Sequence, residues 1–548
     1  MITLRPYQDK ASASVFRAWE TRDAALIVMA TGVGKTVMFS DIIRRTVAAT
    51  GKQALVLAHR QELIWQAKKT LKAFGLKVSV EMGEHKASAD WFHRPDVIVS
   101  TVQTQAVGCG GNGRMSKFRP EDFALVVIDE AHHYGHTGIY EKTLKWYRSN
   151  PALKILGVTA TPDRLDKQNI VSKLGGIAFS FDTLDAIKDG WLVPVKQRMI
   201  VAASIDLSHV RTQAGDLNPG ELSEIMESER PLHQVAGPLV EETFGLRTIV
   251  FTVSVKQAER LAEIINRSRP GKAIAVSAKT PKENRREILK LFRKGVYQYV
   301  VNVGILTEGF DDSGVGCVAV ARPTKSRALY QQMAGRCIRP SESIAHTLGD
   351  LPDASARKEL IAASDKPECL IIDYCGNAGK HKLICTADLL AGDAPPKAVE
   401  RARKRAEKTG EAVDMTEEIA RAKRELEMEE ARKRLRVVAK TTYRKLDIDP
   451  FEALGVTRPP ASFARFDEGP TEKMVNLLAK NGIDASGMTM REAKVIMREL
   501  FRRWDAKLAS VKQSTWLKTK MGLSVPLRKD EASRIMDRVI GARKAVAR

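Results

Sequence analysis

Apolar runs of strand length alternate with longer amphipathic stretches through the first three quarters of the chain. The runs include residues 25–29, 54–57, 96–99 and 125–128. Short continuous apolar runs are typical of strands buried on both faces, and their alternation with helix-length segments predicts parallel sheets covered by helices. We therefore predict an α/β fold with two tandem parallel-sheet lobes, followed by a mostly helical C-terminal region. A ligand would bind at the carboxyl ends of the strands.

The predicted boundaries follow changes in composition along the 548 residues. A first lobe is expected over residues 1–203 and a second over residues 204–394, where a segment ending in two prolines breaks the pattern. Residues 395–450 are rich in Ala, Glu, Lys and Arg, which favours a long exposed helix or a charged linker. Residues 451–548 are expected to form a basic helical domain.

The last hundred residues contain a weak internal repeat. Residues 471–478 and 510–517 align at a separation of 39, and at the same offset Ala493 aligns with Ala532. A glycine follows each first helix, at Gly482 and Gly522, as a helix C-cap requires. The pattern predicts two related helix-turn-helix units that pack into one compact domain, although chance similarity between helical segments is an alternative.

Net charge adds a function to this region. The chain carries a formal charge of +23, and residues 491–548 hold 16 Lys or Arg against 6 Asp or Glu. A basic helical domain predicts an anchor for nucleic acid phosphates. An acidic protein partner, or solubility alone, is the alternative. The expected anchoring cations are Lys507, Lys512, Lys518, Lys520 and Arg528.

Two motifs predict a nucleoside triphosphate site. Residues 29–36 read MATGVGKT, and residues 129–132 read DEAH directly after an apolar run. Glycines let backbone N–H groups turn toward phosphates, Lys35 can reach the β and γ oxygens, and the Thr36 hydroxyl can ligate Mg²⁺. Asp129 would hold the metal's water shell and Glu130 would be the general base for the attacking water. Hydrolysis is the expected chemistry.

An ordered series of motifs resembles the superfamily 2 helicases and translocases of the DEAH-box kind. The resemblance is to the restriction-type branch, which includes type III restriction, RadD-like and prophage helicases. Met29 replaces the usual first glycine of the phosphate loop. Besides the two motifs above, the series comprises residues 4–8, 55–63, 99–103, 157–162, 249–253, 301–311 and 332–339.

The resemblance implies two RecA-like lobes that bind ATP and Mg²⁺ between them, and it implies a role for each motif residue. Arg336 and Arg339, three residues apart on an expected helix, would point together across the cleft at the γ-phosphate. The implied catalytic residues are Lys35, Asp129, Glu130, Arg336 and Arg339, the nucleotide-binding residues are Arg5, Gln8, Thr31, Gly32, Val33, Gly34, Lys35, Thr36, Gly309, Asp311 and Gln332, and the metal ligands are Thr36 and Asp129. The implied nucleic-acid contacts are His59, Arg60, Ser100, Thr101, Gln103, Thr252 and Thr307, and the coupling residues are His132, Thr159 and Thr161.

The function expected from the resemblance is an ATP-dependent DNA helicase or translocase that moves 3′ to 5′. A duplex translocase without strand separation, an RNA helicase and a nucleotide-gated DNA-binding scaffold are alternatives. The expected partners are single-stranded or duplex DNA, RNA as a further substrate, and a nuclease or a replication or repair protein bound through the C-terminal domain.

Cysteine usage and hydropathy predict the cellular compartment of the protein. Six cysteines in this length indicate reduced thiols, and no apolar run reaches the length of a membrane span. Without a targeting segment before Leu4, we expect a cytosolic protein. Cys369, Cys375, His381 and Cys385 cluster in sequence but lack a C-x₂-C pair, so no structural zinc is predicted.

Overall fold

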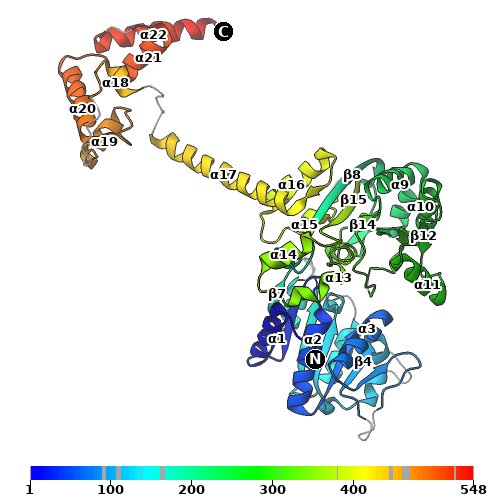
Figure 1. The fold of residues 1–548 in the computed structure, drawn as a ribbon. Coiled ribbons are helices and arrows are strands. Elements are labelled where there is room, and N and C mark those ends of the chain that lie inside the picture. Colours follow the sequence, from blue (N-terminus) through cyan, green and yellow to red (C-terminus); the bar gives the residue numbers. More distant parts are fainter. Residues whose placement is uncertain are drawn as a thin grey trace. The chain divides into compact units, whose positions relative to one another are not determined.

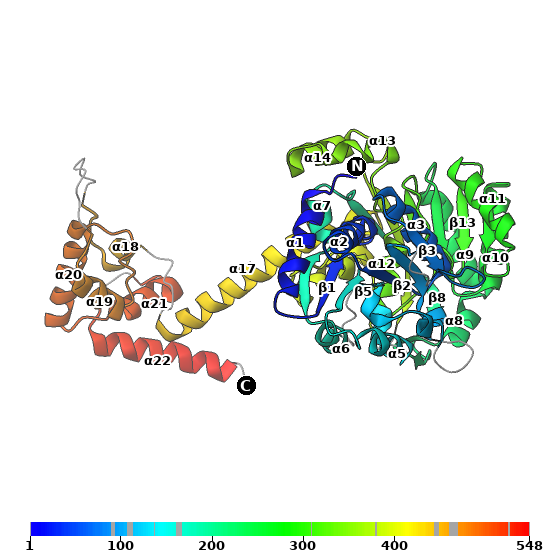
Figure 2. The same ribbon diagram turned by 90° about the horizontal axis from the view of Figure 1, so that it is seen from below.

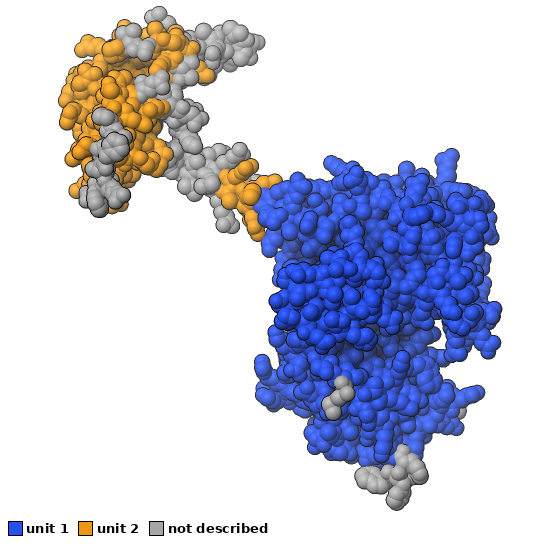
Figure 3. Space-filling model, viewed as in Figure 1, with its two compact units in different colours: residues 1–426 blue, residues 427–548 orange. Residues whose placement is uncertain are grey.

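The chain folds into two compact units, which Figure 3 shows in separate colours. They comprise Met1–Leu426 and Glu427–Arg548. The computed structural model describes residues 2–88, 94–106, 113–135, 138–160, 167–307, 309–378, 381–442, 449–459, 469–523 and 526–546.

The first lobe is built on a seven-stranded sheet in which every pairing is parallel, in the order β3-β4-β2-β5-β6-β1-β7. The central strands β1, β2 and β5 are buried along their whole length, as their continuous apolar runs predict. The strands are β1 (Ala24–Met29), β2 (Gln53–Ala58), β3 (Val78–Glu81), β4 (Val97–Thr101), β5 (Phe123–Asp129), β6 (Lys154–Thr159) and β7 (Ile177–Phe181).

Helices cover this sheet on both faces (Figures 1 and 2). The longest, α2, starts directly at the phosphate-loop lysine and buries one side against the sheet. The α-helices are α1 (Pro6–Trp19), α2 (Lys35–Thr50), α3 (Gln61–Ala73), α4 (Val102–Ala106), α5 (Gly138–Tyr147), α6 (Lys167–Lys173) and α7 (Thr183–Lys188), with short 3-10 turns at η2 (Arg114–Lys117), η3 (Pro120–Asp122) and η4 (Ala131–Gly135).

The second lobe has its own seven-stranded sheet, in the order β12-β13-β11-β14-β15-β8-β16, which is parallel except at its last pair. The predicted pair of tandem parallel-sheet lobes is therefore confirmed. The strands are β8 (Val195–Asp206), β11 (Thr248–Phe251), β12 (Ala273–Val276), β13 (Tyr299–Asn302), β14 (Cys317–Val320), β15 (Cys369–Asn377) and β16 (Val413–Asp414), and β9 (Thr212–Gln213) pairs separately with β10 (Asp216–Leu217).

Strand β8 corrects the predicted border between the lobes. It spans residues 195–206 and pairs in parallel with β15, so the border expected between residues 203 and 204 falls inside a strand of the second sheet. The hydrophobic pattern could not show this, because an apolar strand has the same pattern in either sheet. The second sheet therefore begins at Val195.

The helices of the second lobe also overturn part of the predicted linker. Residues 396–409 form α16, which buries Ala398, Val399, Ala402 and Ala406, so this segment packs on the lobe instead of standing free. The helix ends at Gly410, whose φ of 68° is the left-handed cap that glycine favours. The helices are α8 (Pro219–Met226), α9 (Glu229–Glu242), α10 (Val255–Ser268), α11 (Lys282–Arg293), α12 (Arg327–Ala334), α13 (Glu342–Ala345), η5 (Thr347–Gly349), α14 (Ala354–Ala362), α15 (Thr386–Leu389) and α16 (Pro396–Thr409), and the border between the two compact units falls within the next helix, α17 (Met415–Thr442).

The C-terminal unit is helical, and its helices follow the 39-residue offset. Helices α20 and α22 both begin at equivalent positions, Met490 and Lys529. One apolar cluster centres on α19 and α20 and includes Leu478, with Val511 of α21 joining it, and a second, smaller cluster contains Leu517 of α21. The helices, grouped together in Figure 2, are α18 (Pro450–Leu454), α19 (Glu472–Lys480), α20 (Met490–Asp505), α21 (Val511–Met521) and α22 (Lys529–Val546).

Candidate nucleotide site

The phosphate loop connects β1 to α2 and requires glycine at two positions. Gly32 has φ of 90° and Gly34 has φ of 79°, both in the left-handed region. A Cβ atom at Gly34 would lie 2.5 Å from Nε2 of Gln8. Gly34 caps α2, so the loop N–H groups and the positive end of the helix dipole face the same place. This is the geometry of an anion site.

Lys35 and the DEAH residues meet beside this loop. The Lys35 ammonium lies 3.7 Å from Oε1 of Glu130, and both side chains are almost buried. Nζ of Lys35 is enclosed and has no hydrogen-bond acceptor among the described residues. A buried ammonium of this kind is costly until an anion satisfies its donors. The arrangement therefore fits a bound polyphosphate.

Glu130 is held in an unusual backbone conformation. Its φ of 51° is left-handed, although the residue is not glycine. Its carboxylate lies 3.4 Å from Nδ1 of His132, which in turn lies 3.2 Å from the Thr159 hydroxyl on β6. Strain at a buried acid is a feature of functional sites, where the surrounding structure stabilises it. Glu130, His132 and Thr159 thus form one contiguous polar path from β5 to β6.

The residues present also fit a magnesium ion. Asp129 is 6% exposed and lies at the end of β5. Strand β1, which is two places from β5 in the sheet, leads into the phosphate loop that carries Thr36. A carboxylate and a hydroxyl are hard oxygen ligands, which Mg²⁺ prefers together with phosphate oxygens. Thr36 and Asp129 would hold the ion.

The N-terminal motif contacts the phosphate loop directly. The Gln8 amide donates to the carbonyls of Val33 and Gly34, at 3.1 and 3.3 Å, and the Tyr7 hydroxyl donates to the Val33 carbonyl at 2.8 Å. The backbone N–H of Arg5 donates to Oε1 of Gln8 at 2.9 Å. Gln8 therefore joins the N-terminal motif to the backbone of the phosphate loop.

Sequence reasoning missed the aromatic and cationic group around this motif. Trp191 is buried and lies under two guanidinium groups, with Arg5 at 4.9 Å and Arg357 at 4.2 Å from its ring centre. Tyr7 stacks on Phe181, with ring centres 4.6 Å apart. Arg357 comes from α14 of the second lobe, and no local pattern could have indicated that it reaches the first lobe.

The second lobe reaches the phosphate loop through Arg339 and Gly335. A Cβ atom at Gly32 would lie 3.0 Å from Cγ of Arg339, and one at Gly335 would lie 2.6 Å from Cβ of Thr31. Arg339 is ion-paired with Asp311. Burial lowers the pKa of its guanidinium to about 10, so the group still carries its charge at neutral pH. An arginine of the second lobe thus lies against the phosphate loop, and its role toward a γ-phosphate stays a prediction.

Arg336 occupies a different position, and one part of the prediction is wrong. Helix α12 ends at Ala334, so Arg336 and Arg339 do not share a helix face. Arg336 is buried and donates to the carbonyls of Thr307, Phe310 and Gln332 inside the second lobe. Gly335, the first residue after this helix, abuts Thr31 of the first lobe, and sequence periodicity reveals neither the helix end nor this contact. In this conformation Arg336 holds its own lobe together.

Two further nucleotide-site candidates also lie at this boundary. Gln332 is buried, and its amide nitrogen has no hydrogen-bond partner among the residues that are described. Gly309 has φ of 71°, and a Cβ there would lie 2.6 Å from Cβ of Glu62 in the first lobe. Gln331 donates to the Ala160 carbonyl across the lobes at 3.2 Å. Thr161, a predicted coupling residue, lies outside the described residues.

The predicted nucleic-acid contacts divide into accessible and buried residues. Gln103 is exposed, and Arg60 donates across the lobes to the Gly304 carbonyl at 3.0 Å. The His59 ring lies 3.9 Å from that of His133. By contrast, the hydroxyls of Ser100, Thr101, Thr252 and Thr307 are buried and are bonded within their own lobes. These four hydroxyl groups hold segments of their own lobes in place and do not face a bound nucleic-acid strand.

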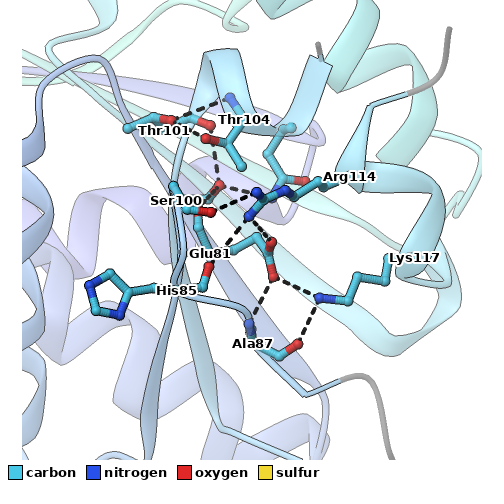
Figure 4. Close-up of polar contacts among 10 residues, drawn as sticks. Glu81, His85, Ala87, Ser100, Thr101, Thr104, Arg114 and Lys117 are labelled. Carbon is cyan, nitrogen blue, oxygen red and sulfur yellow. Dashed lines mark hydrogen bonds and ion pairs between the residues drawn. The ribbon is translucent and has the colours of Figure 1, made fainter. Parts of the chain in front are cut away.

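Figure 4 shows why the Ser100 segment is rigid. Ser100 donates to the Glu81 carbonyl at 2.8 Å, and the fully buried Glu81 carboxylate pairs with Arg114 at 2.8 Å and Lys117 at 2.9 Å. The Ala87 backbone N–H donates to the same carboxylate at 2.8 Å. Two cations and an amide therefore compensate the charge, and the network fixes the edge of the sheet where β3 and β4 end.

The cysteine cluster has other contacts. Cys369 and Cys385 are buried free thiols, and Nε2 of His381 lies 2.7 Å from the Val210 carbonyl. Among the described residues, no three or more His, Cys, Asp or Glu side chains are grouped as metal ligands. Across that same part of the chain, no helix combines the length and apolar character needed to cross a membrane.

Comparison with known proteins defines the family. Residues 1–164 match the family described as type III restriction enzyme, res subunit, and residues 232–341 match the helicase conserved C-terminal domain. These two matches contain the motifs that meet at the nucleotide site. The chain belongs to superfamily 2, in the restriction-type branch of helicases and translocases.

Individual relatives agree. The chain is 31% identical to IRC3 of Saccharomyces cerevisiae, which carries the name of an ATP-dependent helicase, over 63% of this chain and 50% of that protein. It is 27% identical to irc3 of Schizosaccharomyces pombe, named as a mitochondrial ATP-dependent helicase, over 70% of this chain and 59% of that protein. A 51.5 kDa protein of a Lactococcus phage is 29% identical over 56% of this chain and 61% of its own length. The chain thus spans roughly half to three fifths of these relatives.

Proposed function

We propose that the protein is an ATP-dependent DNA helicase or translocase whose two lobes hydrolyse Mg-ATP between them. The observation that carries this proposal is the position of Arg339. It lies against Gly32 of the phosphate loop, the loop that leads into Lys35, although it comes from the other lobe. A cation delivered across a cleft to the γ-phosphate stabilises transition-state charge only when the lobes are together.

The roles of the residues follow from their chemistry. Lys35 would neutralise the β and γ oxygens, and its buried ammonium would gain the acceptors that it lacks. Glu130 would orient the attacking water and take its proton, with His132 fixing the carboxylate. A magnesium ion held by Thr36 and Asp129 would supply charge neutralisation for the phosphates.

The coupling to nucleic acid would pass through the contacts between the lobes. Gln331 binds the Ala160 carbonyl, and Arg60, from a predicted nucleic-acid segment, binds the Gly304 carbonyl. Both bonds join backbone of one lobe to a side chain of the other, so lobe separation breaks them. Cycles of ATP binding and hydrolysis would then shift the two nucleic-acid surfaces against each other along one strand. The resemblance favours DNA and 3′ to 5′ movement.

The test is an ATPase assay with single-stranded DNA, duplex DNA and RNA, with and without magnesium. Stimulation by single-stranded DNA, joined to strand separation of a duplex with a 3′ tail, is expected. Stimulation by duplex alone, with displacement of a bound protein roadblock, would favour a duplex translocase. Stimulation by RNA alone would favour an RNA helicase, and absence of turnover with intact DNA binding would favour a nucleotide-gated scaffold.

Two further expectations belong to this proposal. A nuclease or a replication or repair protein would bind through the C-terminal unit, and the protein would act in the cytosol. Co-purification with the full chain, compared with a chain lacking residues after Pro470, tests the first. The second stays a prediction, since one relative is named as mitochondrial.

A further inference from the structure

Two aromatic rings lie exposed near the end of α20 in the C-terminal unit. Phe501 is 44% exposed and Trp504 is 48% exposed, although the same helix buries Ala493, Ile496 and Leu500 on the adjoining side. The two rings touch edge to face, with centres 5.4 Å apart. Large aromatic rings left in water forgo the stabilisation that burial would give, so a paired, exposed arrangement indicates a binding surface.

Cations flank the ring pair. Arg491, Lys494 and Arg498 are exposed and precede Phe501 at helical spacings that place all four on one side of α20. None of these three cations has an ion pair within the described part of the chain, while Asp505 adds one acidic group on the same side. The surface therefore combines apolar rings with unpaired positive charge.

Lys507 completes the group at the end of the helix. Its φ of 50° is left-handed, a conformation that a glycine would adopt at lower cost. Backbone bonds hold it there, since its N–H donates to the Trp504 carbonyl at 3.1 Å and its own carbonyl accepts from Lys529 at 3.0 Å. The backbone of the exposed Lys507 is thus fixed directly after α20, close to Trp504 in the chain.

We propose that Phe501 and Trp504 form a stacking platform for the bases of single-stranded nucleic acid, with Lys494, Arg498 and Lys507 on its phosphates. Rings stack on any base, so this contact is tolerant of sequence, and neighbouring cations follow the backbone. Bases in a duplex are already stacked, so the platform would select single strands. The inference rests on the proposed function and refines it, because it locates a second strand contact outside the two lobes.

The experiment compares the full chain with a Phe501→Ala, Trp504→Ala double variant by fluorescence anisotropy. The probes are oligothymidylate, oligouridylate, an abasic strand of equal length and a duplex of equal length. We expect the double variant to bind oligothymidylate about 10-fold more weakly or worse, because neither ring can then stack on a base. Affinity for the abasic strand and the slope of log affinity against log salt should stay unchanged, since no phosphate contact is removed.

Controls separate stacking from folding. Phe244→Ala removes a ring that is 75% exposed on the second lobe and should leave all affinities unchanged. The conservative Phe501→Tyr, Trp504→Phe variant should keep most of the affinity for oligothymidylate. Should the alanine variant unfold by circular dichroism, Lys494→Glu with Arg498→Glu tests the same surface through a strong loss of affinity for both oligothymidylate and the abasic strand.

The outcomes that overturn the platform differ from those that overturn the ATPase. Equal affinities of wild type and the alanine variant for oligothymidylate, or equal weakening on the abasic strand, would exclude stacking and favour a protein partner. Equal effects on oligouridylate and oligothymidylate would extend the platform to RNA, whereas an effect on RNA alone would overturn the DNA assignment. Absence of ATP turnover would overturn the proposed function while leaving base-dependent binding intact.

Discussion

The candidate nucleotide site and the C-terminal unit offer their proposed ligands residues of opposite character. Lys35 and Glu130 are 11% and 12% exposed; Lys35 begins α2 and Glu130 directly follows the buried strand β5, so their geometry is fixed by the core. The cations of the C-terminal unit stand on exposed helix faces. In low dielectric a single charge has a large effect, whereas exposed charges are screened and act together. One site should therefore fail with one substitution, and the other only with several.

The largest effect is expected at Lys35 and Glu130. Glu130→Gln should slow ATP hydrolysis by about 10²- to 10⁴-fold, because the general base is removed while the size of the side chain is kept. ATP should still bind and should hold the lobes together on DNA. Lys35→Ala should abolish turnover and also weaken ATP binding, since its ammonium contacts the phosphates in the ground state. Steady-state kinetics and nucleotide binding separate the two.

Normal turnover in Glu130→Gln would contradict its assignment as the base. Glu141→Gln is a suitable control, because Glu141 is an exposed acid of the same lobe. It should leave turnover unchanged.

The second prediction uses Arg339. Arg339→Ala should leave ATP affinity nearly intact and should lower kcat by about 10²- to 10³-fold, as removal of one donor to transition-state charge does. The measurement compares kcat and the dissociation constant for ATP between the variant and the wild type. A large decrease in affinity with little change in kcat would show that Arg339 binds the ground state instead.

Arg336→Ala should act differently, which sharpens the contrast between the two arginines. It removes donors from three backbone carbonyls in the second lobe, and the free energy of unfolding should fall by about 2–4 kcal/mol. Thermal or urea unfolding of the variant measures this. If Arg336→Ala has the free energy of unfolding of the wild type but no longer hydrolyses ATP, Arg336 would instead act at the γ-phosphate.

The sequence predicted the buried strands well, because a strand pattern depends on neighbouring residues, whereas the chemical roles of the motif residues stay predictions. The phosphate loop and DEAH motif end buried strands as expected, and the apolar run at residues 125–128 lies within β5. The motif series also indicated that Arg339 would face the phosphate loop. The order of the motifs implies this relation by resemblance to the family, even though the sequence does not show which contacts join the two segments.

Other features depend on contacts that are distant in sequence. Gly335, which follows the end of α12 at Ala334, abuts Thr31, some three hundred residues away in the other lobe. Ser100 lies in a motif predicted to contact nucleic acid, yet its hydroxyl is hydrogen-bonded to Glu81 and Gln105 within the lobe. Likewise the alanines of α16 gave no indication of which surface they cover. Periodicity predicts that a face is buried, but not against what.

The third prediction tests the C-terminal unit as a whole. Removing residues after about Pro470 should leave ATP hydrolysis without nucleic acid unchanged, because the nucleotide-site motifs lie before Pro340. DNA affinity should fall, and the magnitude of the salt slope should fall by roughly one unit for each phosphate that the shortened chain no longer binds. Unchanged affinity and slope, with a folded core, would assign the unit to a protein partner.

The smallest effect is expected for one exposed cation of α21. Lys512 is exposed and has no ion pair within the described residues, so Lys512→Ala removes charge without breaking an internal contact. Its phosphate contact would account for about 0.7 to 0.9 of the salt slope, depending on whether the DNA is single-stranded or duplex. Affinity should therefore fall by only a few-fold at moderate salt, equally for all sequences. Turnover without DNA should not change.

Lys512→Arg is the matched control, because it keeps the charge and should keep the slope. The double variant Lys512→Ala, Lys520→Ala should reduce the slope by about twice as much as either single variant, since exposed phosphate contacts are nearly independent. A single substitution that abolished binding would contradict the distributed anchor and would instead indicate a buried, specific contact of the kind that Lys35 makes. If the changes in the salt slope add in this way, the C-terminal unit binds the phosphate backbone of the nucleic acid through several exposed cations. The proposed motor in the same chain would depend instead on single buried residues.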